Sequence, residues 1–240
     1  MTADVPHPRW LYALCRRLFV VLIAWPVVLL WLGLTVRHPQ RLPQRGPAVI
    51  IANHNSHLDL LVLLTLLPFR LLPRLRPVAA ADYFFRNRGL RFIARWFLGL
   101  IPVQRGGATR GDGESGGDPL RLCREALAAG DILLLFPEGT RGEPETLSKL
   151  KPGLWHLLRD TPELPVIPLY LQGLGKSMPK GEWIPIPFFV DAYVGRPLPY
   201  DPDKARYLQT LENCFSVLAT KGATRRRTSP PSPTSPPEQS

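Results

Sequence analysis

The sequence predicts an α/β fold with a mainly parallel central sheet covered by helices. From residue 48 onward, short apolar runs alternate with helical patterns, as expected when covering helices join the strands of a parallel sheet. Several of these runs are too apolar to alternate with polar residues, which is typical of strands buried on both faces. The chain has 240 residues, of which 45% are hydrophobic, enough for one substantial core. We therefore expect one catalytic domain.

Six apolar segments are predicted to be strands, and helices fill the gaps between them. The predicted strands are residues 48–52, 77–81, 100–103, 132–136, 166–171 and 188–194. The best-marked helix begins at Asp118, with Pro119 in its first turn, and stops at Gly130. Its apolar residues fall on one face, which should pack on the sheet: Leu120, Cys123, Ala126 and Leu127.

Residues 18–36 contain no charge, and a helix of these 19 residues would be roughly 28 Å long, close to the hydrocarbon thickness of a bilayer. Pro26 lies near the middle, so a kinked spanning helix and a re-entrant hairpin both fit. Alternatively, the run is a helix buried in the core of the protein and not a membrane segment. Three arginines flank the run on each side, so the positive-inside rule gives no orientation.

The net charge of +11 attracts polyanions, either nucleic acid or the anionic face of a membrane. The excess lies at the two ends, +5 in residues 1–45 and +3 in residues 221–240. It does not form an obvious groove with interleaved aromatic residues, as a nucleic-acid site would. We expect a membrane-associated segment at 1–46, a catalytic domain at 47–220, and a disordered basic, Pro/Ser-rich tail at 221–240.

Two sequence features exclude common alternatives. Cys15, Cys123 and Cys214 are odd in number and far apart, so they suggest neither a disulfide framework nor a paired-cysteine metal site, and a reducing compartment is the simpler reading. Residues 106–117 are rich in glycine and are predicted to form a mobile loop. They lack the Gly-Lys-Ser/Thr ending of a nucleotide-binding P-loop.

His54 follows the predicted strand 48–52, at the carboxyl end, where α/β proteins place reactive groups. Asp59 lies three residues after Ser56, which matches a helix capping box and gives the aspartate a purely structural explanation. Alone, this pair is weak evidence of catalysis.

A second polar segment, Phe-Pro-Glu-Gly-Thr-Arg at residues 136–141, also follows an apolar strand. Parallel strands deliver the loops at their carboxyl ends to the same crevice, so the two segments should meet. Read singly, the segment is a turn with a surface arginine.

With these segments in place, the chain resembles the glycerophosphate and lysophosphatidate acyltransferase family. The first signature of that family is Asn-His, four residues, then Asp, as in Asn53, His54 and Asp59. Three further signatures follow in order, namely Gly-Leu-Ile-Pro-Val-Gln-Arg at 99–105, Phe-Pro-Glu-Gly-Thr-Arg at 136–141 and Val-Ile-Pro-Leu at 166–169. The resemblance covers about residues 45 to 175.

The resemblance implies that His54 and Asp59 are catalytic. His54 would take a proton from the acceptor hydroxyl as it attacks a thioester carbonyl, and Asp59 would orient the imidazole and stabilise its protonated form. The resemblance also implies substrate-binding residues that would hold the glycerol phosphate of the acceptor: Arg105, Glu138, Gly139, Thr140 and Arg141. Pro168 would shape the region that binds the acyl chain.

Two nearby residues have alternative explanations. His57 could join His54 and Asp59 in a mononuclear metal cluster, but the other potential ligands are scattered, so we expect no metal and read His57 as a helix-start residue lining the pocket. Lys151 is either a helix-start residue or a further phosphate contact.

The function that the resemblance implies is transfer of a fatty acyl group to the 2-hydroxyl of 1-acylglycerol 3-phosphate. The donor would be acyl-CoA or acyl carrier protein as a co-substrate, with no other cofactor. We expect a membrane lipid acceptor, a membrane surface and no nucleic acid as partners, at the cytoplasmic membrane with the active site facing the cytoplasm. The alternatives are the same chemistry on another lysolipid or a lyso-ornithine lipid, and a non-catalytic, basic membrane- or nucleic-acid-binding protein.

Overall fold

A computed structural model describes residues 8–56, 58–81, 87–103, 118–139, 148–177 and 189–228. These residues form a seven-stranded sheet with the strand order β1-β7-β6-β2-β5-β3-β4. Its strands are β1 (Leu34–Arg37), β2 (Ala48–Ala52), β3 (Leu75–Ala80), β4 (Ile101–Val103), β5 (Ile132–Leu135), β6 (Val166–Gln172) and β7 (Val190–Val194). All six predicted strands are confirmed, with boundaries that differ by up to two residues.

Five neighbouring strands, β6, β2, β5, β3 and β4, run in the same direction. Strand β7 is antiparallel to β6, and β1 is parallel to β7. The mainly parallel α/β fold predicted from the sequence is therefore confirmed, and the carboxyl ends of five strands share one edge of the sheet.

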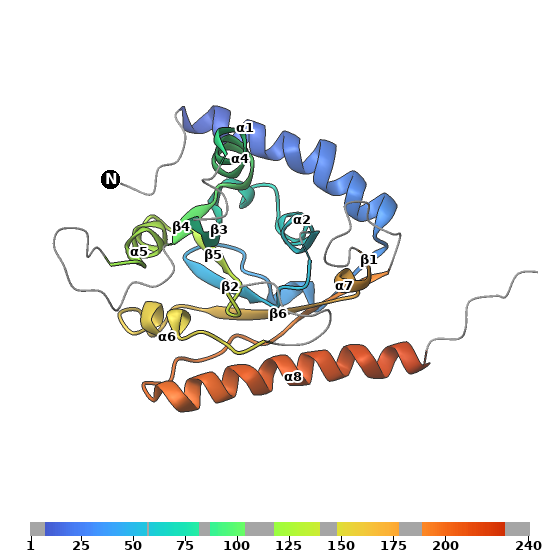
Figure 1. Cartoon of the computed structure of the whole chain (residues 1–240), viewed down its shortest axis with the longest axis vertical. Helices are drawn as coiled ribbons and strands as arrows, with labels where there is room; N and C mark the ends of the chain where they lie inside the picture. The colour runs from blue at the N-terminus through green and yellow to red at the C-terminus, as the bar shows by residue number, and fades with distance from the viewer. Residues whose placement is uncertain are drawn as a thin grey trace, which may run out of the picture.

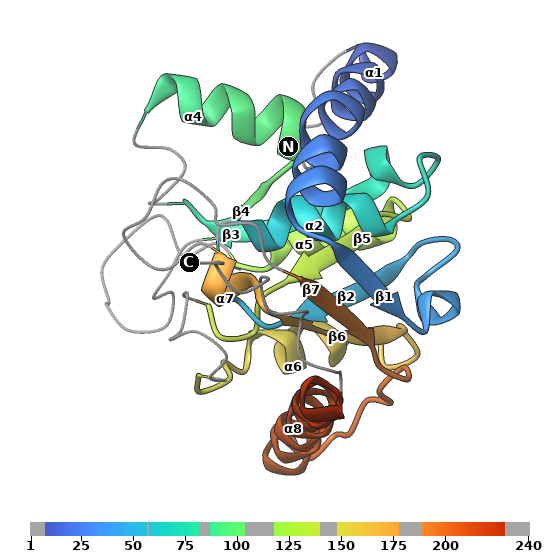
Figure 2. The same cartoon turned by 90° about the vertical axis from the view of Figure 1, so that its right-hand side faces the viewer.

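Helices cover both faces of the sheet (Figures 1 and 2). The N-terminal helix and α2 pack on one face, and α5, α6 and α8 pack on the other. The helical segments are α1 (Arg9–Phe19), η1 (Val20–Ala24), η2 (Val27–Trp31), η3 (Pro39–Arg41), α2 (Leu58–Leu66), η4 (Leu72–Arg74), α4 (Arg88–Ile93), η5 (Ala94–Leu98), α5 (Arg121–Ala128), α6 (Gly153–Leu158), α7 (Leu174–Ser177) and α8 (Lys204–Thr228).

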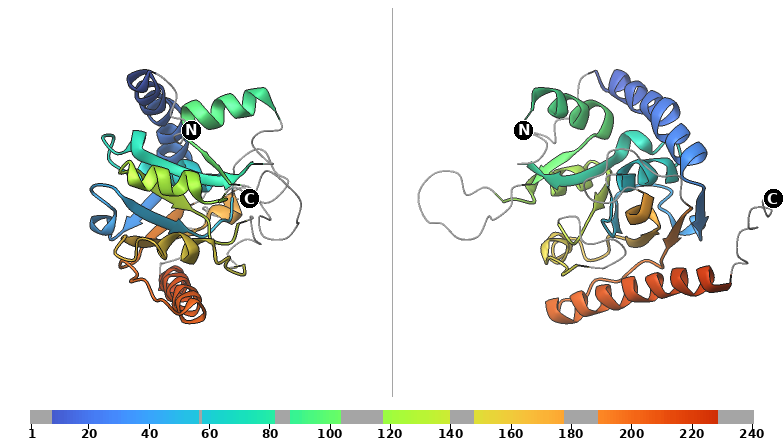
Figure 3. Two further views of the ribbon diagram at one scale, coloured as in Figure 1. Left: turned by 90° about the vertical axis from the view of Figure 1, so that its left-hand side faces the viewer. Right: turned by 45° about the vertical axis from the view of Figure 1, so that its right-hand side comes forward.

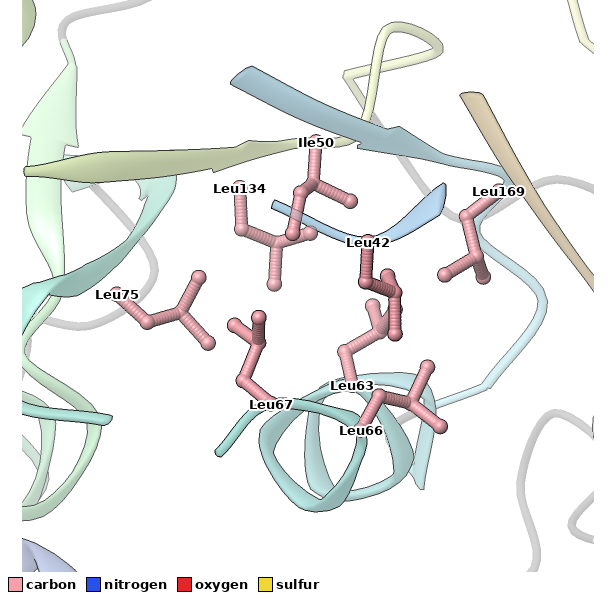
Figure 4. Close-up of a pocket in the computed structure, with 8 residues that line it drawn as sticks. All are labelled: Leu42, Ile50, Leu63, Leu66, Leu67, Leu75, Leu134 and Leu169. Atoms are coloured by element: carbon pink, nitrogen blue, oxygen red, sulfur yellow. The ribbon is translucent and has the colours of Figure 1, made fainter. Parts of the chain in front are cut away.

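Strand β2 is buried on both faces along its whole length, which explains its continuous apolar sequence. Ile50 points toward α2, whereas Val49 and Ile51 belong to the core on the α8 side. Between α2 and the sheet, eight apolar side chains converge (Figure 4), namely Leu42, Ile50, Leu63, Leu66, Leu67, Leu75, Leu134 and Leu169. They leave no room for a water molecule, so this cluster is packed core.

The N-terminal helix, α1 to η2, buries one stripe of residues and exposes the opposite stripe. The buried stripe recurs every four residues: Tyr12, Arg16, Val20, Ala24, Val28 and Leu32. Residues Arg9–Leu30 are long and apolar enough to cross a membrane, a test that the core helix of a soluble protein or a signal sequence can also pass. The predicted apolar N-terminal helix is present.

Arg16 is fully buried and joins this helix to the sheet. Its guanidinium donates to the hydroxyl of Tyr12 at 2.6 Å. A Cβ on Gly99 would lie 2.4 Å from Arg16 Nη1, so Gly99, which has φ of +61°, leaves the space that the arginine occupies. Arg76 donates from Nε to the carbonyl of the same glycine at 2.9 Å. Gly99 is thus in close contact with Arg16 of α1 and is held to β3 by Arg76.

Two predicted boundaries were wrong. The end of the apolar run 18–36 is not helical, because the helix ends at Trp31 and β1 pairs with β7, Leu34 opposite Val190. Helix α8 continues to Thr228, through eight residues assigned to the disordered tail, because each added residue of a helix gains a hydrogen bond and the first proline comes only at Pro230. Residues 106–117 and 229–240 lie outside the described ranges. The three cysteines are free thiols.

Candidate active site

The carboxyl ends of β2 and β5 bring His54 and Glu138 together. The two strands are parallel neighbours, with Ile51 opposite Leu135, so their following loops leave the sheet side by side. The backbone N–H of His54 donates to Glu138 Oε1 at 2.9 Å. Two polar segments separated by 84 positions in the sequence therefore share one site, as the sequence predicted.

Asn53 fixes the chain immediately before His54. Its side-chain amide donates to the carbonyl of Leu171 at 2.9 Å and accepts from the N–H of the same residue at 2.7 Å. The side chain thus continues the pairing between β2 and β6 by one residue, although β2 has ended. Asn53 is buried. Asn53 belongs to the first family signature, but the sequence predicted no role for it.

His54 and Asp59 form a hydrogen-bonded pair. His54 Nδ1 lies 2.9 Å from Asp59 Oδ2. With a proton on Nδ1 donated to the carboxylate, Nε2 carries the lone pair and can accept a proton. The His54 side chain is 22% exposed, whereas Asp59 is 0% exposed. The imidazole is therefore accessible to a substrate on one side, and on the other side its Nδ1 contacts the buried carboxylate of Asp59.

Asp59 also makes the capping contact that the sequence predicted at the start of helix α2. Its Oδ2 accepts the N–H groups of Asn55 at 2.6 Å and Ser56 at 2.9 Å in addition to the imidazole. Complete burial raises the pKa of the Asp59 carboxyl, and the hydrogen bonds from His54, Ser56 and Asn55 oppose this rise. The first turn of α2 adds the positive end of the helix dipole, which also favours the carboxylate.

Phe136 fixes the plane of the His54 ring. The two rings stack with centroids 4.2 Å apart and planes inclined by 22°. Because this contact restrains one face of the imidazole while Asp59 restrains its Nδ1 edge, the Nε2 atom has a defined direction. The sequence prediction did not assign Phe136 to the site, and its position at the end of β5 was the signal available.

Glu138 is buried, with 2% of its surface exposed, and both of its oxygens are occupied. Oε1 accepts the N–H of His54, and Oε2 accepts the N–H of Ser148 at 2.9 Å. The carboxylate therefore joins the β2 loop to the segment that leads into α6. The contact between Glu138 and the acceptor that the family resemblance implied stays a prediction.

Gly139 and Lys151 lie next to each other beyond Glu138. Gly139 has φ of +70°, a conformation that strains other residues. A Cβ at this position would stand 2.8 Å from Lys151 Nζ. The N–H of Lys151 donates to the carbonyl of Pro137 at 2.8 Å, and its side chain is exposed. An exposed cation thus lies over the turn that follows β5.

The other predicted site residues divide into two groups. Arg105, Thr140, Arg141 and His57 lie outside the described residues. Pro168 lies within β6, opposite Ile51, three positions before the residue that Asn53 contacts. Its ring faces Gly195, where a Cβ would be 2.6 Å away, and its carbonyl accepts the N–H of Gly195. Pro168 is therefore not brought to the strand end with His54.

The site combines a proton acceptor held in one orientation with a buried carboxylate behind it. Such a pair can deprotonate a hydroxyl group and stabilise the resulting imidazolium. The described residues contribute the cation of Lys151 at the edge of the site, which is suited to a phosphate group.

Comparison with known proteins agrees with this chemistry. The model of the family described as "Acyltransferase" matches residues 33–172, more than half of the chain. Over 140 residues the chain is 31% identical to 1-acyl-sn-glycerol-3-phosphate acyltransferase BAT2, chloroplastic, of Brassica napus, covering 56% of this chain and 36% of that protein. Over 154 residues it is 34% identical to Taffazin of Dictyostelium discoideum, covering 60% and 50%.

The fold is also that of a solved structure. The 1-acyl-sn-glycerophosphate acyltransferase PlsC of Thermotoga maritima superposes with a TM-score of 0.66 at 18% identity, covering 89% of this chain and 81% of that one. The chain spans about a third to a half of the length of the curated relatives quoted above. On the match of the family model to residues 33–172, the chain belongs to the acyltransferase family.

Proposed function

We propose that this protein transfers a fatty acyl group from a thioester donor to the 2-hydroxyl of 1-acylglycerol 3-phosphate, giving phosphatidic acid. The observation that carries the proposal is the His54–Asp59 pair at the carboxyl ends of the parallel strands, 2.9 Å apart. Support for the acceptor comes from the names of several relatives, which include a plant and an animal 1-acyl-sn-glycerol-3-phosphate acyltransferase.

In the proposed step, the acceptor oxygen attacks the thioester carbonyl carbon while Nε2 of His54 removes the hydroxyl proton. Asp59 stabilises the imidazolium that forms. The tetrahedral intermediate then collapses, an ester bond replaces the thioester bond, and the departing thiolate takes the proton from His54. Atoms and charges balance without an acyl-enzyme intermediate. We propose that acyl-CoA or acyl carrier protein is the donor and that no metal, other cofactor or nucleic acid takes part.

We propose that the acceptor phosphate binds next to the turn after β5. Arg105 and Arg141, which the sequence predicted as phosphate contacts, would supply the positive charge, and Gly139 and Thr140 would supply backbone groups. The exposed Lys151, whose side chain lies over Gly139, supports a phosphate at this position. The acyl-shaping role of Pro168 has less support, since this residue faces Gly195 inside the sheet.

We further propose that the N-terminal helix lies along the cytoplasmic membrane and does not span it. Its buried stripe, from Tyr12 to Leu32, packs on the domain along the whole length of the helix. The opposite stripe exposes apolar side chains such as Trp10, Leu22 and Leu30. A helix held to a domain in this way can contact lipid only with its outer face. The active site would then face the cytoplasm, where the thioester donor is found.

The test of the proposed activity is an assay of purified protein in detergent with a panel of acceptors and both donors. We expect thiol release and phosphatidic acid with lysophosphatidate, and little product with lyso-ornithine lipid or a lysolipid that lacks a terminal phosphate. Preference for an acceptor without phosphate would assign the same chemistry to the alternative substrate.

Glu138 is expected to support the site without contacting the acceptor. In the Glu138→Gln variant, one side-chain oxygen is replaced by an amide that cannot accept an N–H, so the hydrogen bond to His54 or Ser148 is lost. We expect kcat to fall about 10- to 100-fold, as for a small displacement of a catalytic group, with the KM for lysophosphatidate almost unchanged. The exposed Glu163→Gln is the matched control. A large rise in KM at constant kcat would instead indicate direct acceptor binding.

A further inference from the structure

Helix α4 and its continuation η5 lie beside the N-terminal helix, on the side of the molecule away from α8 (Figures 1, 2 and 3). The rings of Phe19 and Phe97 hold the two helices together, with centroids 5.6 Å apart. Phe97 in turn contacts Phe92, whose ring centroid is 6.0 Å away. Helix α4 is therefore a neighbour of the proposed membrane helix, although it comes much later in the sequence.

The exposed surface of α4 and η5 is both cationic and apolar. Arg88, Arg91 and Arg95 are exposed, and neither element contains an acidic residue. Phe92 is 54% exposed and Ile93 is 44% exposed. Arginines interspersed with large apolar side chains on one short helix are typical of segments that lie at a membrane interface.

The neighbouring outer stripe of the N-terminal helix is strongly apolar. Its large exposed apolar side chains recur along the whole helix: Trp10, Leu14, Leu18, Val21, Leu22, Ile23, Trp25, Leu29 and Leu30. A continuous exposed apolar surface of this kind marks an interaction site. The two helices meet at Phe19 and Phe97, so this stripe lies on an element next to the one that carries the arginines.

We propose that α4 and η5 form a second membrane-binding element, in which Arg88, Arg91 and Arg95 bind the phosphates of anionic phospholipids while Phe92 and Ile93 enter the interface. The proposal rests on the membrane association proposed above and adds a lipid preference to it. Charge complementarity selects the partner: three exposed arginines on two elements that contain no acidic residue fit an anionic lipid surface better than a second copy of the same cationic helix.

The position of α4 links this element to the active site. Strand β3 ends at Ala80, at the sheet edge that carries His54, and β4 begins at Ile101, at the opposite edge. The connection between two parallel strands must cross from one edge to the other, so α4 begins on the side of His54. Anionic lipid bound by α4 would therefore hold this edge of the sheet close to the bilayer, from which the acceptor comes.

Binding to vesicles tests the electrostatic part of the proposal. We expect the wild-type protein to bind vesicles of phosphatidylcholine with about 30 mol% phosphatidylglycerol more tightly than pure phosphatidylcholine, and added salt to reduce the difference. The Arg88→Gln/Arg91→Gln variant should bind the anionic vesicles about 5- to 30-fold more weakly and with a smaller salt dependence. Lys204→Gln/Arg206→Gln, which removes two exposed charges from α8, is the matched control and should bind like wild type.

A second pair of variants tests the apolar part. Phe92→Ser should weaken binding to both kinds of vesicle about 3- to 10-fold, because less apolar surface enters the interface. Val217→Ser on α8 is matched to it, since Val217 is also 54% exposed, and should have no effect. Ile93→Ser keeps the aromatic contacts of Phe92 and should reproduce the defect if α4 remains folded, as judged by circular dichroism.

Acyl transfer to detergent-dispersed lysophosphatidate separates this proposal from the proposed activity. The α4 variants should be as active as wild type in detergent and less active on acceptor in anionic vesicles. If they bind vesicles as wild type does, the second membrane element is refuted even though the enzyme is active. If Phe92→Ser instead converts a dimer to a monomer in light scattering without changing vesicle binding, the surface is an interface between copies of the chain.

Discussion

The His54→Ala variant is expected to lose about 10²- to 10⁴-fold in kcat for acyl transfer, the range that a positioned general base contributes. In the proposed mechanism the imidazole accepts the proton, and its Nε2 is the nitrogen that Asp59 does not contact. The alanine variant lacks the imidazole that would accept the proton, but it keeps the backbone N–H that donates to Glu138. The fold and the acceptor-binding turn should therefore be preserved.

Product formation from lysophosphatidate and an acyl thioester, measured against the same protein with His156→Ala, checks this expectation. His156 is exposed on α6, on the far face of the sheet, so its replacement should leave the rate unchanged. If the His54→Ala protein released thiol as fast as the control, the proposed mechanism would be wrong.

Changing Asp59 is expected to separate catalysis from stability. Asn at this position keeps an oxygen that can accept the N–H groups of Asn55 and Ser56, but it carries no charge to stabilise the imidazolium of His54. We expect kcat to fall about 10²- to 10⁴-fold, as when the carboxylate of a hydrolase triad is replaced by an amide. Thermal unfolding should change little.

Asp59→Ala should lose stability as well as activity. It leaves two buried backbone N–H groups at the start of α2 without an acceptor, which costs about 2 to 5 kcal/mol of unfolding free energy. Denaturant titration of the two variants measures this difference, and Asp160→Asn, in a side chain that is 51% exposed, is the control for loss of a carboxylate. Equal destabilisation by Asn and Ala would mean that the charge, and not the hydrogen bonds, stabilises the α2 start.

The buried strands could be predicted because their sequences leave few alternatives. Residues 48–52 are apolar throughout and end at Asn53, and the structure places β2 at these positions. The edge strand β1 could not be found, because Leu34 and Val36 continue the apolar run of the helix before them. Its strand conformation depends on pairing with Val190 of β7, a contact that local sequence does not reveal. The full length of α8 could not be predicted, because the basic residues at its carboxyl end are equally common in disordered tails.

Which loops meet at the site could be predicted, but the arrangement of their side chains could not. The spacing of His54 and Asp59 and the segment after β5 indicated which loops meet, and His54 does lie beside Glu138. The direction of the Glu138 side chain could not be predicted, because it depends on the N–H of Ser148, ten residues further on. The aromatic contact of Phe136 could not be predicted either, because a residue at the end of a strand can face either side of the sheet.

The pairing of β1 with β7 has a consequence for the order of biosynthesis. The N-terminal helix and β1 leave the ribosome long before the strand with which β1 pairs, since β7 ends at Val194. The stripe from Tyr12 to Leu32 therefore has no complete sheet to pack on until most of the chain has been made. During that interval the first helix is an apolar segment without its protein partner, and the proposed membrane association would let it contact the bilayer before the fold is complete.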